Sequence, residues 1–390
     1  MLQIYYTFCI MLKAYKYRLF PIREQKEILA KQFGCARFVY NWGLAEKIKA
    51  YTTSKKTLSC FDLTNQLTKK KKEPEFEWLQ ETYAQVLQMS LRNLDNAFTA
   101  FFRKQNRFPK FKHKNSKQST SYPQGIKVDF DNQTIRIPKV GWVTIVIDRK
   151  FEGKIKTVTV SKTVTDKYFA NILVEDDKPL PDKVNVTEEG TVGVDVGLKD
   201  FAILSTGEKI PNPKYLRNAE IRLAVKQRQL SRKKKGSNKR IKAKKDVALV
   251  YEKISNQRSD FIHKISSKLI SENQAVVIED LNISGMLKNH CLAKGISDVA
   301  WSKLFGFLAY KSDWYGKTLI QIGRFSLSSK ICNICGEVNH NLKLSDREWV
   351  CSECKTKHDR DINAAINIKK FGLLGGKVIS TRINKATLSG

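Results

Sequence analysis

The sequence lacks any long run of apolar residues. Its longest stretch without Asp, Glu, Lys or Arg is residues 1–12 of the 390, whereas a membrane-spanning helix needs about 20 apolar residues. No basic residue precedes this stretch and no small-residue cleavage site follows it, so it does not fit a signal peptide. We therefore expect no transmembrane helix and a cytoplasmic location. Residues 1–10 are predicted to be either a start extension ahead of Met11 or a short extra strand.

Acidic residues are scarce relative to basic ones. Lys and Arg total 71 while Asp and Glu total 38, which leaves a formal charge of +33. Because such a surplus repels itself, a polyanionic partner is the simplest explanation. The 41% of hydrophobic and 10% of aromatic residues are enough for a buried core and exclude a disordered basic tail. The length suggests two or three domains.

Hydrophobic periodicity predicts a mixed α/β protein. Residues 13–20 alternate as a half-buried strand does, and two amphipathic helices follow, at about residues 23–50 and 82–102. Closely spaced short strands then suggest a small barrel or sandwich; they are predicted at 126–130, 134–137, 142–147, 154–161 and 168–174. Beyond residue 182 we predict a further domain, with a hairpin around Asp195, helices over most of 213–270 and at 296–316, strands at 275–281 and 318–323, and a last helix that opens near Asp359.

Two basic segments are candidates for nucleic-acid contact. Residues 107–124 interleave cations with aromatic rings, a combination that suits phosphate binding and base stacking. In residues 226–245, eleven of twenty side chains are Lys or Arg and none is acidic, a density that is costly unless phosphate neutralises it. The alternatives are an ordinary loop whose aromatic residues enter the core, and a solvated charged face. The residues predicted to touch nucleic acid are Arg107, Lys110, Lys112, Lys233, Lys234 and Lys235.

Two cysteine pairs form a pattern typical of a metal site. The sequences CNIC and CSEC are separated by fifteen residues. Because CxxC lets both thiolates of a pair reach one metal from a tight turn, two such turns complete a closed tetrahedral shell. Nearby Trp349 and Leu342 are expected to supply a small apolar contact, and His358 is expected to be a non-ligand. We predict one structural Zn²⁺ bound by Cys332, Cys335, Cys351 and Cys354.

Three acids far apart in the chain are candidate ligands for hard cations. Asp195 ends one predicted strand, Glu279 ends another, and Asp361 opens the last helix in HDRDINAAINI. Singly, each has an ordinary alternative: a turn cap, a surface acid, or a helix N-terminal acid. Apolar neighbours would bury the first two, however, and gathered carboxylates repel unless cations join them. Residues 363–365 give the last helix a small face that can lie close to a sheet. Two Mg²⁺ ions about 4 Å apart could activate water and hold a scissile phosphate, which suggests phosphodiester hydrolysis.

These segments resemble the TnpB family of transposon-encoded, RNA-guided DNA endonucleases, which are related to type V CRISPR effectors. The resemblance runs from Met11 to about Phe371 and rests on the following, in chain order: KAYKYRLFP, FVYNWGL, RFPKFKHK, GVDVGLKDFAILSTG, VIEDLNISGM, the two CxxC pairs and HDRDINAAINI. It implies a RuvC-like nuclease domain of RNase H fold whose catalytic, Mg²⁺-binding acids are Asp195, Glu279 and Asp361. Asp359 is the less favoured acid of DRD because the family's DxNAA pattern begins at Asp361.

The resemblance also implies an order of domains. The expected fold class is α+β or α/β multidomain, with an N-terminal small β-barrel and a C-terminal RuvC-like domain. Its parts are expected at residues 11–180 for the wedge-like barrel, with a helical recognition insertion at about 22–105; at 183–328 and 356–372 for the RuvC-like domain; at 329–355 for an inserted zinc ribbon; and at 373–390 for a tail without an assigned role.

The function implied is RNA-guided, Mg²⁺-dependent cleavage of DNA, by a protein that a transposable element encodes in a prokaryotic, nucleoid-associated setting. The expected partners are a guide RNA and double-stranded target DNA with a short flanking motif, because in such systems base pairing reads the sequence and protein reads the motif. Two alternatives remain. A nuclease-inactive, RNA-guided DNA-binding repressor would typically have lost triad acids, and all three are present. An RNase H-fold DNA transposase would not be expected to carry a cysteine ribbon ahead of DRDINAA.

Overall fold

The computed structural model describes residues 10–381 apart from 116, 325 and 344. The start extension predicted at residues 1–10 therefore lies, except for Ile10, outside the described residues, as does the tail beyond residue 381. The chain divides into two compact units, one comprising Met11–Lys178 and the other beginning at Pro179. Each unit has its own hydrophobic core.

The first unit is built on a seven-stranded sheet with the order β2-β6-β7-β1-β5-β4-β3. Tyr17 and Leu19 alternate into its core at 1% exposure each, as the sequence pattern predicts. The predicted strands are confirmed, and β2 is an additional strand inside the segment predicted to be a loop. The bounds are β1 (Ile10–Phe20), β2 (Gln118–Tyr122), β3 (Lys127–Asp129), β4 (Thr134–Ile137), β5 (Gly141–Val146), β6 (Lys154–Lys162) and β7 (Tyr168–Pro179).

This sheet is a half-barrel and not the closed small barrel that the sequence suggests. Its order ends at β2 on one side and β3 on the other, and these two strands do not pair with each other. β2 and β3 have only five and three residues. Each forms a short hydrogen-bonded ladder with one neighbouring strand, and its outer edge is an open edge of the sheet. Alternation of apolar and polar residues within a strand shows that one face of the sheet is buried. Because one face is buried in open and in closed sheets alike, the pattern does not distinguish them.

Four helices follow β1 in the chain and precede β2: α1 (Arg23–Ser54), α2 (Cys60–Lys70), the 3₁₀ helix η1 (Pro74–Glu81) and α3 (Ala84–Phe102). The predicted helices at 23–50 and 82–102 are confirmed as α1 and α3. They pack through an apolar cluster that includes Val39, Leu44, Leu91 and Leu94, all with 0% exposure. α2 runs into the basic sequence at 69–73, and η1 follows it directly.

The second unit contains a six-stranded mixed sheet with the order β10-β9-β8-β11-β12-β15. The central strands β8, β11 and β12 are parallel, whereas β9, β10 and β15 are antiparallel to their neighbours. The predicted hairpin is confirmed as β8 and β9, with Asp195 opposite Ile203. The bounds are β8 (Thr191–Asp195), β9 (Asp200–Leu204), β10 (Lys209–Pro211), β11 (Ala275–Glu279), β12 (Thr318–Ile322) and β15 (Lys377–Ile379).

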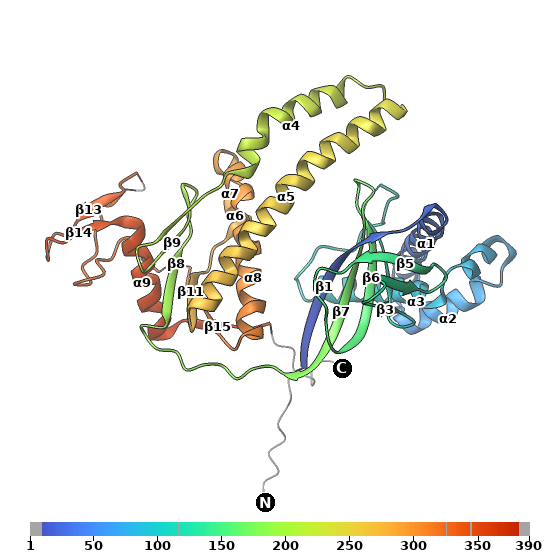
Figure 1. Ribbon diagram of the computed structural model, residues 1–390, viewed down its shortest axis with the longest axis horizontal. Coiled ribbons are helices and arrows are strands. Elements are labelled where there is room, and N and C mark those ends of the chain that lie inside the picture. Colours follow the sequence, from blue (N-terminus) through green and yellow to red (C-terminus); the bar gives the residue numbers. More distant parts are fainter. Residues whose placement is uncertain (1–9, 116, 325, 344, 382–390) are drawn as a thin grey trace, which may run out of the picture. The chain divides into compact units, whose positions relative to one another are not determined.

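Helices of the second unit are α4 (Tyr215–Ser231), α5 (Asn238–Glu272), α6 (Ile283–Met286), α7 (His290–Val299), α8 (Trp301–Trp314) and α9 (Arg360–Gly375). α4 and α5 form a long two-helix arm whose far end extends well away from the sheet (Figure 1). The single helix predicted at 296–316 is wrong, since Ala300 adopts a left-handed conformation (φ 54°) that separates α7 from α8. No helix in the described part of the chain is long and apolar enough to span a bilayer.

Candidate functional site

The three acids singled out in the sequence lie around one pocket of the second unit. Asp195, Glu279 and Asp361 all line a cavity of about 380 Å³. They come from β8, β11 and the first turn of α9, respectively. The fold thus brings together side chains that the chain separates by more than eighty residues at each step.

Strand pairing places the first two acids at one edge of the sheet. β8 and β11 are parallel neighbours, and Ile278 lies opposite Val194 in their register. Asp195 and Glu279 are the next residues of their strands, so both lie where the carboxyl ends of parallel strands meet. The residues before them are buried because the sheet is covered on both faces, by α5 and α8 on one side and α9 on the other.

The third acid is positioned by a close approach between α9 and β8. A Cβ atom at Gly193 would collide with the backbone oxygen of Ala365, so glycine is required for this packing. Ala364 and Ala365 are 3% and 0% exposed, which confirms the small helix face predicted at residues 363–365. Asp361 therefore lies on the first turn of a helix whose backbone contacts the strand that ends in Asp195.

The pKa values of Asp195 and Glu279 are shifted upward by their surroundings. Burial, together with the negative charges of Glu279 and Asp361, raises the pKa of Asp195 to about 8, while the Arg360 guanidinium opposes the shift. Burial also raises the pKa of Glu279, and the hydroxyl of Ser328, which donates to Glu279 Oε1 at 2.6 Å, opposes that shift. Such mutual repulsion is what a bound divalent cation would relieve.

Two arginines that the sequence analysis does not single out contact Asp361. Arg347 Nη1 donates to Asp361 Oδ2 at 3.1 Å, and Arg360 donates to Oδ1 through Nε at 3.0 Å and Nη2 at 2.9 Å. Both guanidiniums line the pocket, together with the lysines Lys199, Lys330 and Lys343. Arg360 is the arginine of the DRD sequence and was visible there, whereas nothing in the sequence distinguishes Arg347 or Ser328 from other polar residues.

The two acids of DRD have different surroundings. Asp359 is the N-cap of α9: its Oδ1 accepts from the backbone N–H groups of Asp361 and Ile362 at 3.0 Å each. Its other oxygen accepts from Lys209 Nζ at 2.5 Å. Both oxygens of Asp359 are thus bound, one by the helix cap and one by the lysine. The two acids differ in position, because Asp361 lines the pocket and Asp359 does not.

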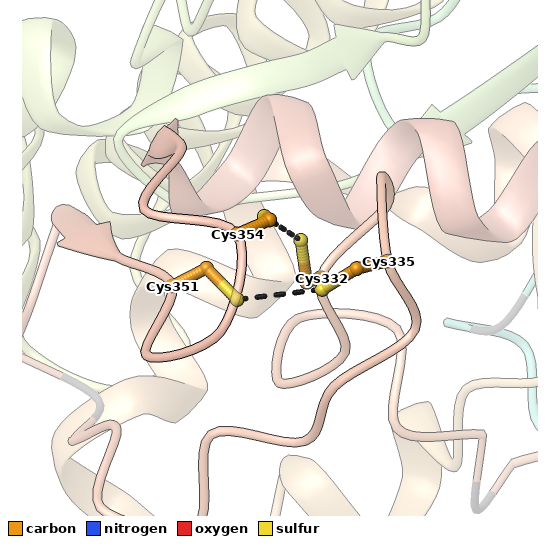
Figure 2. Close-up of side chains that lie close together, drawn as sticks. All are labelled: Cys332, Cys335, Cys351 and Cys354. Atoms are coloured by element: carbon orange, nitrogen blue, oxygen red, sulfur yellow. Dashed lines mark hydrogen bonds between the residues drawn. The ribbon is translucent and has the colours of Figure 1, made fainter.

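The four CxxC cysteines come together in the second unit. Figure 2 shows their side chains converging from two loops, with Sγ–Sγ distances of 3.6 Å between Cys332 and Cys354 and 3.5 Å between Cys335 and Cys351. Their ligand atoms all lie within 4.8 Å of one another, and they form the group of potential metal ligands found among the described residues. Four thiols in a closed set suggest a zinc site, with no open position for substrate.

A small ribbon surrounds this cluster. Strands β13 (Glu348–Val350) and β14 (Lys357–Asp359) pair antiparallel, with Trp349 opposite His358. Trp349 and Leu342 pack against Cys332 and Cys351, which confirms the apolar contact predicted for them. His358 is not in the four-thiol group, but its Nε2 lies 3.1 Å from Cys332 Sγ. It is therefore placed as an outer hydrogen-bonding partner of the cluster.

The predicted nucleic-acid contacts lie in two different environments. Lys233, Lys234 and Lys235 are exposed at the turn that joins α4 to α5. Arg107 and Lys110 are also exposed, whereas Lys112 places its ammonium 3.8 Å from the ring centre of Tyr40.

Part of the aromatic pattern in 107–124 belongs to the core. Tyr122 is 0% exposed on β2 and hydrogen-bonds Gln32, and Phe108 packs edge-on against Phe98 and Phe101. The prediction that these rings face a ligand is therefore wrong for Tyr122, because β2 needs an apolar residue there, and Phe108 remains 45% exposed.

Fold and site together define a class. A solved cryo-EM structure of a Cas12f1–sgRNA–target DNA complex resembles this chain with a TM-score of 0.56 at 12% identity, over 92% of this chain and 99% of that one. The half-barrel sheet of the first unit, and the mixed sheet and four-cysteine cluster of the second, are consistent with a Cas12f-like fold.

Sequence comparisons place the chain within that class. Family models match at residues 171–290 ("Probable transposase", OrfB_IS605), 301–368 ("Cas12f1-like, TNB domain") and 11–56 ("Helix-turn-helix domain"). A Streptomyces pristinaespiralis protein named "Putative RNA-guided DNA endonuclease" is 41% identical over 93% of this chain and 89% of its own length. Escherichia coli K12 "Putative RNA-guided DNA endonuclease InsQ" is 31% identical over 93% and 92%. The chain belongs to the IS605 OrfB/TnpB family.

The structure qualifies one of these descriptions. Residues 11–56, which match the helix-turn-helix model, form most of β1 and the single long helix α1. The local architecture there is a strand followed by one helix, and not two helices joined by a turn.

Proposed function

We propose that this protein is an RNA-guided DNA endonuclease in which Asp195, Glu279 and Asp361 hold divalent cations for phosphodiester hydrolysis. The observation that carries the proposal is the convergence of these acids on one pocket that also has a cationic lining. Carboxylates without a bound metal ion would repel a phosphate, and lysine and arginine side chains without a metal ion would not activate water. A site with both suits a metal-dependent reaction on a polyanion.

The residues that line the pocket have the chemistry that Mg²⁺ requires of its ligands. Mg²⁺ takes oxygen ligands and keeps several waters, and three carboxylates that line a cavity of about 380 Å³ offer the oxygens and leave room for water. Bound Mg²⁺, expected as two ions, would supply Lewis-acid stabilisation and a nucleophilic water at neutral pH. Ser328 holds the Glu279 carboxylate in place by its hydrogen bond, while Arg347 and Arg360 orient that of Asp361.

The cations of the pocket have a second role in this proposal. Lys199, Lys330 and Lys343 also line the cavity, and their positive charges would attract the phosphate backbone. The guanidinium of Arg347 presents five donors in a planar fork, of which one contacts Asp361, so it can also bind a phosphate oxygen. In this proposal, these groups would stabilise the negative charge that develops during phosphoryl transfer.

We further propose the domain roles that the resemblance implies. The half-barrel unit (residues 11–180, with helices between about 22 and 105) would grip the guide RNA and read the DNA motif beside the target. The mixed sheet (183–328 and 356–372) would be the RuvC-like, RNase H-fold nuclease domain. The ribbon (329–355) would hold one structural Zn²⁺, and the exposed lysines at the α4–α5 turn would contact nucleic acid.

The test is cleavage by purified protein. The protein is supplied with the guide RNA transcribed from its own locus, matched double-stranded DNA and Mg²⁺. We expect wild-type protein to cut the target, and Asp195→Asn and Glu279→Gln proteins to bind it without cutting. Glu188→Gln, which changes an exposed acid outside the pocket, is the matched control and should cleave normally.

Other outcomes would redirect the assignment. Undiminished cleavage by Asp195→Asn protein would refute the site. Tight, guide-dependent target binding that leaves DNA intact in both Mg²⁺ and Mn²⁺ would indicate a repressor. Strand joining by protein without RNA would support a transposase, the activity named by the family model that matches residues 171–290.

A further inference from the structure

The first cysteine loop is hydrogen-bonded to one face of α9. Asn363 is 1% exposed, and its side-chain amide makes two bonds: Nδ2 donates to Ile331 O at 2.8 Å, and Oδ1 accepts from Asn333 N at 2.9 Å. One turn later, Asn367 is 2% exposed and its Nδ2 donates to Ile331 O at 2.6 Å and Ser328 O at 2.8 Å. Two buried amides thus bind the backbone that carries Cys332.

The opposite face of α9 is different in kind. It carries Ala365, Ile368 and Gly372, which meet Gly193, Val277 and their neighbours in the sheet. Residues three and four apart share a helix face, so Asn363 and Asn367 form one polar row and the small apolar residues form another. The apolar row is enough to dock α9 on the sheet, and the polar row attaches the helix to the cysteine loop.

The loop that carries Cys332 also contacts Glu279, one of the three acids of the pocket. Ser328, whose carbonyl accepts from Asn367, donates its hydroxyl to Glu279 Oε1 at 2.6 Å. Asp361 lies two residues before Asn363 on the first turn of α9. The loop of residues 328–333 therefore touches one acid through Ser328 and holds the helix that carries another.

We infer that the metal bound by the four cysteines sets the positions of the carboxylates in the neighbouring pocket, and that Asn363 and Asn367 are the positioning residues that connect the two sites. The inference rests on the proposed role of Asp195, Glu279 and Asp361 as ligands of divalent cations. It assigns to the cysteine cluster a part in the assembly of the nuclease site, in addition to holding the ribbon together.

The physical basis is the narrow tolerance of a metal site. Ligands must be held within about 0.5 Å of a productive geometry, which requires that their supporting residues be fixed as well. The loop has no secondary structure of its own around Cys332 apart from a single bridge between Ile331 and Val338. Metal bound to Cys332 would fix the position of the loop. The hydrogen bonds from Asn363 and Asn367 to the loop would then fix the position of α9. Loss of an outer-shell partner typically lowers metal affinity about 10-fold to 100-fold.

The experiment measures Mn²⁺ binding to the full-length protein by electron paramagnetic resonance, with zinc content determined in parallel. We expect Asn363→Ala and Asn367→Ala proteins to retain one zinc per chain and to bind Mn²⁺ about 10-fold more weakly than wild type. Asn341→Ala, which changes an exposed asparagine of the same ribbon, is the matched control and should bind Mn²⁺ as wild type does.

A second measurement does not depend on how the variants fold. Removal of zinc from wild-type protein with a thiol reagent and chelator should weaken Mn²⁺ binding, and restored zinc should recover it, since coupling between sites is reciprocal. Unchanged Mn²⁺ affinity in zinc-free protein and in both asparagine variants would overturn the inference.

One further variant separates this failure from that of the proposed function. Asp195→Asn protein should lack the signal of bound Mn²⁺ that wild-type protein gives. If it does not, the acid site itself is wrongly assigned; if it does while the asparagine variants bind normally, only the coupling is refuted.

Discussion

Arg347 and Asp361 form an ion pair at 3.1 Å that joins the cysteine ribbon to the first turn of α9. Asp361 is mostly shielded, with 19% of its side chain exposed, while 53% of Arg347 is exposed. The arginine therefore neutralises a carboxylate of the acid pocket and keeps other donors open to solvent. The backbone of Arg347 adds a further link, because its carbonyl accepts from the N–H of Arg360 at 2.8 Å.

We predict that Arg347→Ala lowers the rate of DNA cleavage by about 100-fold, the typical effect of removing one donor at a site of developing charge. Guide-RNA binding should be unchanged, because the substitution removes one charge of many. Arg347→Lys keeps the charge and loses the planar fork, so its rate should be intermediate. Single-turnover cleavage and RNA-binding titrations check this. A normal rate for Arg347→Ala protein would show that the ion pair is only structural.

The raised pKa of Asp195 predicts that metal binding depends on pH. With a pKa of about 8 in the metal-free protein, this carboxyl is mostly protonated at pH 6.5 and must lose its proton when a cation binds. Apparent Mg²⁺ affinity should therefore rise with pH, by at most about 10-fold per unit below pH 8, and level off above it. Cleavage titrated with Mg²⁺ from pH 6.5 to 8.5 measures the trend. A midpoint that does not move with pH would contradict it.

The same shift has a consequence for stability. The folded-state pKa of Asp195 lies above the ordinary value of 3.8, so ionisation of this group opposes folding, and the cost grows as pH rises from about 4 to 8. In Mg²⁺-free buffer at pH 8, Asp195→Asn should stabilise the protein, by about 1–3 kcal/mol. The gain should vanish near pH 4. Thermal unfolding at the two pH values tests the sign, and a destabilised variant at pH 8 would contradict it.

Metal loss at the cysteine cluster should be specific to the four predicted ligands. Cys351→Ser replaces a buried thiol of the cluster, and we expect it to lower zinc content from one per chain to near zero. Cys291→Ser is the matched control, because Cys291 is exposed and outside the cluster. Elemental analysis of the two purified proteins decides the point. Equal zinc content in both would show that the four thiols do not bind zinc as a set.

The salt dependence of RNA binding tests the exposed lysines at the α4–α5 turn. If all three contact phosphates, neutralising Lys233, Lys234 and Lys235 to Gln should reduce the slope of log K against log salt by about 2, at about 0.7 per contact for a single strand. The triple Arg variant keeps the charges and should keep the slope. An unchanged slope in the Gln variant would mean that the lysines form a solvated face.

Much of the local structure follows from local patterns. Alternation predicts β1 and the strands from β3 to β7, and CxxC spacing predicts the four-thiol cluster. These features depend on neighbours in the chain, and local periodicity and spacing report them directly. β15 was not predicted, because three residues at a sheet edge are too few to show a period, and its pairing partner β12 is more than fifty residues away.

The amino-acid sequence by itself determined the basic character of the chain, the pairing of the CxxC cysteines into one candidate metal cluster and the choice of three candidate acids. Only the tertiary structure decided that those acids share a pocket, that Arg347 and Arg360 neutralise one of them, and that Asn363 and Asn367 bind the cysteine loop. The physical reason is distance along the chain. A carboxylate's partners are chosen by parallel strand register and by the approach of α9 to Gly193, and neither is visible until the chain has folded.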